Sequence, residues 1–250
     1  MPIIIAIENY TPKNGISSVK YAENDVRVFK QLLCQSMGVL EENIHEFVND
    51  NACKSSLEYN LKTLFYSLTE EDRLIFYYVG HGFHNGIMNF LSTYDLHRVN
   101  ISETAVSLQK ILLDPLKKSK CKHALILIDA CAQSFQDENE RNHITGINDE
   151  DFMEVTSEFP YYATFLSCQT GQSSYSSDVL QNGIWTHHLV QAMRGVIPET
   201  IRDGNYITDR LLSDYLSTEV AKYVRDELQK EQNPKSVLDS TYENVIVKYN

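Results

Sequence analysis

The sequence has few basic residues and few cysteines for its length, and it lacks any long apolar run. Its 250 residues hold 22 Lys and Arg against 34 Asp and Glu, a formal net charge of −12. This balance opposes phosphate backbones and anionic lipids, so neither nucleic acid nor a membrane is expected as a partner. The apolar residues 3–7 are too few for a signal peptide or a membrane span. We therefore expect a cytoplasmic protein.

The cysteine pattern excludes two further classes. No C-x-x-C pair occurs among the five residues, which are Cys34, Cys53, Cys121, Cys131 and Cys168. An odd number at wide spacing fits neither a disulfide framework nor a thiolate zinc site, and it indicates a reducing compartment. The chain also lacks a G-x-S-x-G turn and a Walker loop, which disfavours serine hydrolases and nucleotide hydrolases.

Short strand-like runs alternate with segments of helical periodicity. Apolar and β-branched residues dominate the expected strands, at 2–7, 44–48, 73–79, 123–128, 163–167 and 244–248. Apolar side chains recur at helical spacing within 19–33, 57–68 and 211–220. This alternation predicts an α/β fold, a three-layer sandwich with a mostly parallel sheet of about six strands and helices on both faces. We expect one domain over residues 1–250.

Residues 132–158 depart from this pattern. The segment is polar, shows no helix or strand period, and carries eight acidic residues against one basic residue, Arg141. Long loops inside compact domains are uncommon and tend to be functional. We expect an inserted loop rather than a linker between domains, because the strand that follows is needed to complete the sheet.

Two expected strands end in residues that can do chemistry. The strand at 73–79 runs into Gly80-His81-Gly82, and the strand at 123–128 runs into Asp129-Ala130-Cys131. Reactive groups of parallel sheets collect at the carboxyl ends of strands. If these strands are neighbours, the imidazole can take the thiol proton and later protonate a leaving amine. The glycines permit a tight turn, and the amides of Gly82 and Cys131 are natural donors to an oxyanion.

Each of these residues also has a purely structural interpretation. A free cysteine is usually a small buried hydrophobe, and a histidine after a glycine can be a turn residue. Asp129 can cap the turn that follows it, and Asp25 lies near a helix start, where capping is common. The joint pattern of His81 and Cys131 is harder to explain by packing.

The sequence resembles the caspase-like cysteine peptidases, and within them the metacaspases and their bacterial relatives, the orthocaspases. The resemblance covers nearly the whole chain, through residues 3–10, 22–25, 77–82, 127–131, 166–174, 183–186 and 232–234. It implies that Cys131 is the nucleophile, that His81 is its acid/base partner, and that backbone amides including Gly82 form the oxyanion site. It also implies a large portion over about 1–131 and a small portion over about 159–250, separated by the acidic loop.

The same resemblance bears on specificity. Caspases that cut after aspartate place a glutamine two residues before the nucleophile, whereas metacaspases place an aspartate there and another on the first helix. Here these positions hold Asp129 and Asp25. Two carboxylates at one pocket repel each other unless a cation joins them, so a substrate arginine or lysine is the fitting ligand. The expected activity is hydrolysis of protein or peptide substrates after Arg or Lys, through an acyl-enzyme.

Some features depart from the metacaspase pattern. Val79 replaces the usual serine two residues before the histidine, and Ala132-Gln133-Ser134 replaces the usual Ser-Gly after the nucleophile. Many metacaspases need calcium, but Asp95 offers one carboxylate where two are expected. His81 and His84 are spaced as two metal ligands can be, but no second cluster of Cys, His or carboxylate residues accompanies them. We therefore expect no metal and no cofactor, with calcium dependence disfavoured.

Two questions stay open at this stage. A peptidase of basic specificity has one place to cut in the acidic loop, after Arg141, although the arginine of a solvated loop can equally be incidental. The alternatives to a working enzyme are a catalytically silent scaffold and an effector domain that stays idle until an activating protein partner orders its loops. The presence of both His81 and Cys131 speaks against the scaffold.

Overall fold

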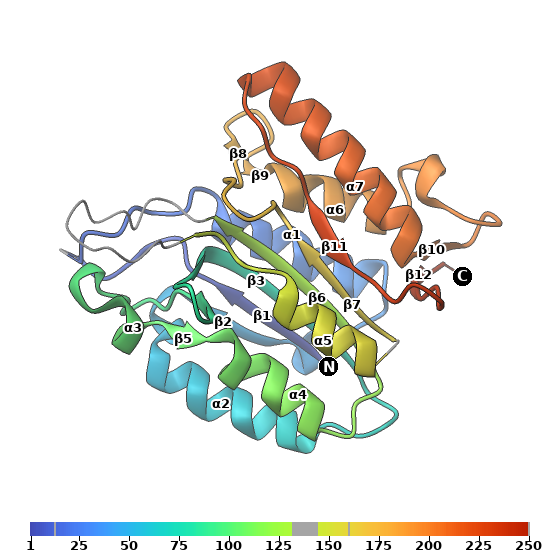
Figure 1. Cartoon of the computed structure of the whole chain (residues 1–250). Helices are drawn as coiled ribbons and strands as arrows, with labels where there is room; N and C mark the ends of the chain where they lie inside the picture. Colours follow the sequence, from blue (N-terminus) through green and yellow to red (C-terminus); the bar gives the residue numbers. More distant parts are fainter. Residues whose placement is uncertain (13, 132–144, 160, 250) are drawn as a thin grey trace.

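The computed structural model describes residues 1–12, 14–131, 145–159 and 161–249, and for Cys131 it describes the main chain alone. The path through its central sheet follows the order β11-β7-β6-β3-β1-β2 (Figure 1). These strands are β1 (Pro2–Ala6), β2 (His45–Val48), β3 (Arg73–His84), β6 (His123–Cys131), β7 (Tyr162–Leu166) and β11 (Lys235–Val237). All pair in parallel except β11, which is antiparallel to β7. In addition, β4 (Asn89–Leu91) pairs with the end of β3 and with β5 (Val106–Ser107).

Helices cover both faces of the sheet. On one face lie α2 (Lys54–Ser67), α4 (Asp114–Lys118) and α5 (Glu150–Glu158), and on the other lie α1 (Ala22–Gln35), α6 (Ile184–Met193) and α7 (Asp209–Tyr223). The short α3 (Ile101–Thr104) precedes β5. Successive side chains of a strand point to opposite faces, so Leu74 and Phe76 join the first layer while Ile75 and Tyr77 join the second. The predicted three-layer α/β sandwich is confirmed.

The sixth strand of the sheet is not the one predicted from residues 244–248. In the structure β12 (Val245–Lys248) pairs with β10 (Tyr206–Thr208) in a separate two-stranded sheet. The two end residues of β12 are exposed, so this strand is not covered as an inner strand would be. The strand that pairs with β7 at the edge of the main sheet is instead Lys235–Val237, which is too short and polar to give a recognisable pattern.

The expectation of a structureless loop over 132–158 is wrong for its last third, where the chain forms α5. Phe152, Val155 and Thr156 are buried at helical spacing, and Glu150 and Asp151 occupy the first turn, where the helix dipole favours acids. The many acids of this segment obscured that apolar stripe. Residues 132–144 lie outside the described part of the chain. Within the described residues, no helix has the length and apolar character needed to cross a membrane.

A partly buried histidine of α6, His188, packs against α7. The His188 ring lies near the rings of Tyr215 and Tyr223, with Nδ1 3.1 Å from the Tyr215 hydroxyl. Its Nε2 is buried without a hydrogen-bond partner among the described residues. Burial, helped by the neighbouring His187, lowers the pKa of His188 to about 4.

This pKa predicts a loss of stability on mild acidification. The unfolded chain takes up a proton at His188 near pH 6.5, whereas the folded chain resists it until about pH 4. Between pH 7.5 and pH 5 the group should therefore lower the free energy of unfolding by about 2 kcal/mol. Urea denaturation of the wild type and of His188→Gln at both pH values measures this difference. Equal losses in the two proteins would contradict the assignment.

Candidate active site

The two residues that the sequence singles out lie side by side in the sheet. β3 and β6 pair in parallel from Arg73 opposite His123 to His81 opposite Cys131. Neighbouring strands are separated by about 4.8 Å, so the main chains of His81 and Cys131 are adjacent, at the last residue of β6 and near the carboxyl end of β3. The condition on which the dyad was predicted, that the two strands be neighbours, is thus met.

Hydrogen bonds and stacking fix the imidazole of His81. The side chain is 2% exposed and stacks on Tyr10, with 5.3 Å between ring centroids. Its Nε2 lies 2.8 Å from the carbonyl oxygen of Ser17. A carbonyl only accepts hydrogen bonds, so Nε2 carries the proton of the neutral ring. Nδ1 is then the nitrogen that can accept a second proton.

A second group of contacts holds the main chain at His81. Its carbonyl accepts from the Ser92 amide (2.8 Å) and from the Tyr78 hydroxyl (2.7 Å). The hydroxyls of Tyr10 and Tyr78 both contact the Ser92 hydroxyl, at 2.8 and 2.7 Å. These residues come from three different segments, so sequence reasoning about the dyad did not identify them. Together they hold the histidine in place near the carboxyl end of β3.

The glycines on either side of His81 do not form the predicted tight turn. β3 continues as a strand through His84, and neither glycine has a positive φ. Their role is close packing: a Cβ on Gly80 would lie 2.5 Å from the Tyr78 hydroxyl, and one on Gly82 would lie 2.8 Å from the Ala130 Cβ. Ile147 approaches the same point at Gly82 from the segment after residue 144.

Asp129 and Asp25, from different elements, both approach Gly183 in β9 (Asn182–Gly183). Asp129 accepts hydrogen bonds from Ser174 (2.7 Å) and Thr186 (2.8 Å). Asp25 accepts from the Asn182 side chain (2.8 Å) and the Gly183 amide (3.0 Å). A Cβ on Gly183 would lie 2.9 Å from one carboxylate oxygen and 3.0 Å from the other. The structure therefore brings the two predicted specificity residues together.

Both carboxyl groups are buried, and this controls their protonation. Burial raises the pKa of Asp25 well above its usual range, and the nearby Asp129 raises it further. Burial likewise raises the pKa of Asp129, while the hydrogen bonds from Ser174 and Thr186 oppose the rise. None of the ion pairs among the described residues involves either aspartate. The pair therefore has no cationic partner within that part of the chain.

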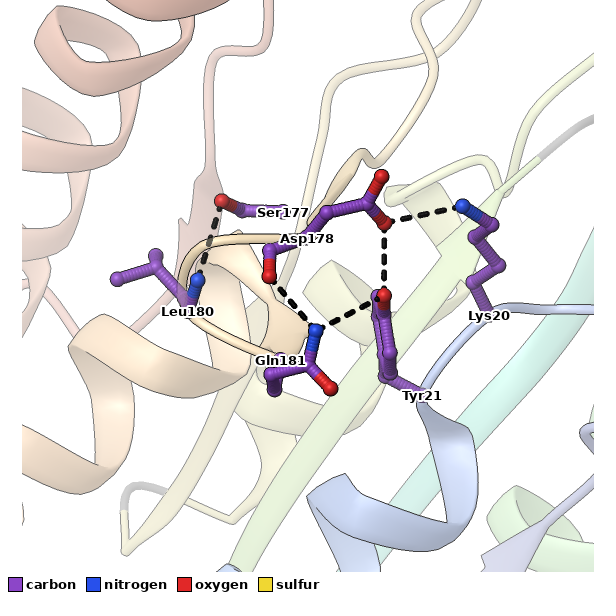
Figure 2. A network of polar contacts seen from close by, with 6 residues as sticks. All are labelled: Lys20, Tyr21, Ser177, Asp178, Leu180 and Gln181. Carbon is purple, nitrogen blue, oxygen red and sulfur yellow. Dashed lines mark hydrogen bonds and ion pairs between the residues drawn. The ribbon is translucent and has the colours of Figure 1, made fainter.

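A surface network fastens the hairpin that carries Gly183 to the segment before α1 (Figure 2). The hairpin consists of β8 (Ser176–Ser177) and β9. Oδ1 of Asp178 accepts from the Tyr21 hydroxyl (2.7 Å) and from Lys20 Nζ (2.9 Å), and Gln181 donates to the Tyr21 hydroxyl (3.2 Å). Tyr21 and Asp178 are 157 positions apart. No local sequence pattern predicts a contact between residues so far apart, which explains why sequence reasoning missed it.

The remaining predicted residues take no part in this cluster. Arg141 lies outside the described residues. Asp95, considered for calcium, accepts the Lys54 amide (2.9 Å) at the start of α2. Across the described ranges, no three His, Cys, Asp or Glu side chains gather as a metal site requires. Independence from calcium stays a prediction.

The close approach at Gly183 gives a direct test of the site's packing. Gly183→Ala places a methyl group against both carboxylates, and overpacking of this kind should lower the free energy of unfolding by about 1–3 kcal/mol. Ser176→Ala, at the paired position of the same hairpin, should change it by less than about 0.5 kcal/mol. Urea denaturation compares the two variants. An unchanged midpoint for Gly183→Ala would contradict the crowding described here.

Comparison with known proteins agrees with this geometry. The caspase domain matches the chain over residues 1–245, which is nearly its whole length. A search of curated proteins finds no match. The three-layer sandwich, with its histidine and cysteine at neighbouring strand ends, agrees with the family match. The chain belongs to the caspase-domain family of cysteine peptidases, whose substrates are proteins.

Proposed function

We propose that the protein is a cysteine endopeptidase that hydrolyses peptide bonds after arginine or lysine, with Cys131 as nucleophile and His81 as its acid/base partner. The observation that carries the proposal is the β3/β6 register, which sets these residues opposite one another. The family match supports peptidase chemistry. The metacaspase-like specificity rests on Asp25 and Asp129.

The first half of the reaction forms an acyl-enzyme. Nδ1 of His81 accepts the thiol proton of Cys131, and the thiolate attacks the carbonyl carbon of the scissile bond. The oxyanion that develops accepts hydrogen bonds from backbone amides, for which Gly82 is the proposed donor. Collapse of this intermediate breaks the C–N bond, and the imidazolium gives its proton to the leaving amine. A thioester to Cys131 remains.

The second half releases the acid product. His81 removes a proton from water, the hydroxide attacks the thioester, and the returning proton restores the thiol. Throughout, the bond from Nε2 to the Ser17 carbonyl keeps the ring in one tautomer and stabilises the imidazolium. Stacking on Tyr10 prevents the ring from turning away.

The two aspartates provide the proposed basis for specificity. A guanidinium or ammonium group entering beside Gly183 would meet two carboxylates that have no cation among the described residues. The attraction favours the ionised form of both acids, which burial otherwise opposes. Because both pKa values are raised, binding of a basic side chain should weaken on acidification at a higher pH than for an ordinary aspartate. An acidic side chain at the same position would be repelled.

A fluorogenic peptide panel tests this proposal. Substrates with Arg, Lys or Asp before the scissile bond should show cleavage of the first two only, and Cys131→Ala should abolish it. Asp129→Asn should lower kcat/KM on the arginine substrate at least about a hundredfold, because a buried charge pair is lost. Asp239→Asn, a change outside the site, should leave it unchanged. Full activity of Asp129→Asn would refute the specificity, and activity of Cys131→Ala would refute the nucleophile.

We also propose that the enzyme cuts its own chain after Arg141. The support is the sequence: Arg141 is the only basic residue between positions 132 and 158. Intact-mass analysis should show two fragments for the wild type, and one uncut chain for both Cys131→Ala and Arg141→Gln. An active wild type that remains uncut would remove autoprocessing from the mechanism.

A further inference from the structure

A cavity of about 230 Å³ lies at the end of the sheet opposite to the candidate active site. Arg73 and His123, the first residues of β3 and β6, line it together with Tyr161 and residues 243–246. Arg73 precedes His81 by eight positions on one continuous strand. At 3.3 Å per residue the cavity is therefore about 26 Å from the proposed dyad and separate from it.

Arg73 is the unusual group in this cavity. It pairs with His123 in the parallel register, so the two side chains are neighbours on one face of the sheet. Burial lowers the pKa of the guanidinium. Among the described residues, no carboxylate forms an ion pair with Arg73 and no hydrogen bond from its guanidinium is found. Arg73 is partly buried, and a charge that is partly removed from water is stabilised by an ionic partner, which this arginine lacks among the described residues.

The one carboxylate among the residues that line the cavity is already engaged. Glu243 lines the same cavity, but its carboxylate is bound by Arg202 in an ion pair. Hydrogen bonds from Thr208 and Arg202 hold the pKa of Glu243 below its usual value. Burial and the charge of Arg73 lower the pKa of His123, so this ring is neutral at pH 7 and can donate one hydrogen bond. The charge left uncompensated in the cavity is therefore positive, in a chain of net charge −12.

Aromatic rings lie beside Arg73 in this cavity and at its border. The His123 and Tyr161 rings stack, with centroids 4.9 Å apart, and Tyr242 adjoins Tyr161 at 5.8 Å. Tyr161 is 43% exposed, Tyr242 49% and Val245 46%. Ring faces and an apolar side chain beside an unpaired guanidinium suit a flat ligand that carries an anion. The volume is below the range of drug-sized pockets, which favours a ligand with a single ring.

We propose that this cavity binds a small aromatic carboxylate, with the guanidinium of Arg73 holding the carboxylate and the ring lying against Tyr161 and Val245. His123 donates a further hydrogen bond to the same carboxylate. The inference uses neither Cys131 nor the Asp25/Asp129 pair, so it stands or falls separately from the proposed peptidase activity.

Calorimetry on the full chain with 4-hydroxybenzoate tests the ligand class. The neutral isostere 4-hydroxybenzamide should bind at least tenfold more weakly, because it cannot form the charge-assisted contact to Arg73. Cyclohexanecarboxylate, which lacks the flat ring, should also bind more weakly. Equal binding of the acid and the amide would overturn the role of Arg73. Equal binding of cyclohexanecarboxylate or of inorganic phosphate would overturn the aromatic part of the proposal.

Variants locate the site. Arg73→Gln should weaken 4-hydroxybenzoate binding at least tenfold, and so should Tyr161→Ala, whereas Arg225→Gln, at an exposed arginine, should not change it. Because no bond from the guanidinium is lost, Arg73→Gln without ligand should unfold at the same temperature as the wild type or higher. A marked fall in that temperature would show that Arg73 serves the fold, and unaltered binding by Arg73→Gln would place the ligand elsewhere. Either result overturns the proposal.

Discussion

The pairing of β3 with β6 is the constraint on which the rest of the site depends. The two strands run together from their first residues to the His81/Cys131 pair. A slip of one residue would transfer every side chain of one strand to the opposite face, and would remove Asp129 from Thr186 and from Asp25. The buried apolar side chains of both strands oppose such a slip, because each packs in the core between the sheet and the helices on one of its faces. The chemistry is thus positioned by packing over the whole length of two strands.

The site also carries an electrostatic cost. Two buried carboxyl groups close to one another destabilise the folded chain unless something offsets their charge, and their hydrogen bonds to Ser174, Thr186 and Asn182 do so only in part. The network of Lys20, Tyr21 and Asp178 joins the hairpin that carries Gly183 to the segment before α1. Under the proposed specificity, aspartates held by these hydrogen bonds would need little reorganisation to bind a cation.

The sequence is informative where the signal is local and uninformative where contacts join distant segments. The runs of β1, β3 and β6 are continuous in apolar residues, so these strands and their reactive ends are visible in the sequence. β11 has only Lys235, Ser236 and Val237, and nothing local distinguishes it from a loop. α5 was missed because its acids outnumber the buried Phe152 and Val155. The Tyr21–Asp178 contact and the Tyr10–Ser92–Tyr78 cluster depend on chain folding alone, and no spacing rule predicts them.

The polypeptide on either side of the 132–144 segment is interlocked rather than arranged as two separate bodies. β6, before the segment, hydrogen-bonds along β7, after it, and Asp25 near the start of the chain holds the amide of Gly183. Both apolar layers draw residues from each side. A single nick in the backbone there would leave these non-covalent contacts in place. The two pieces would therefore stay joined as one particle under native conditions, and only a denaturant would separate them.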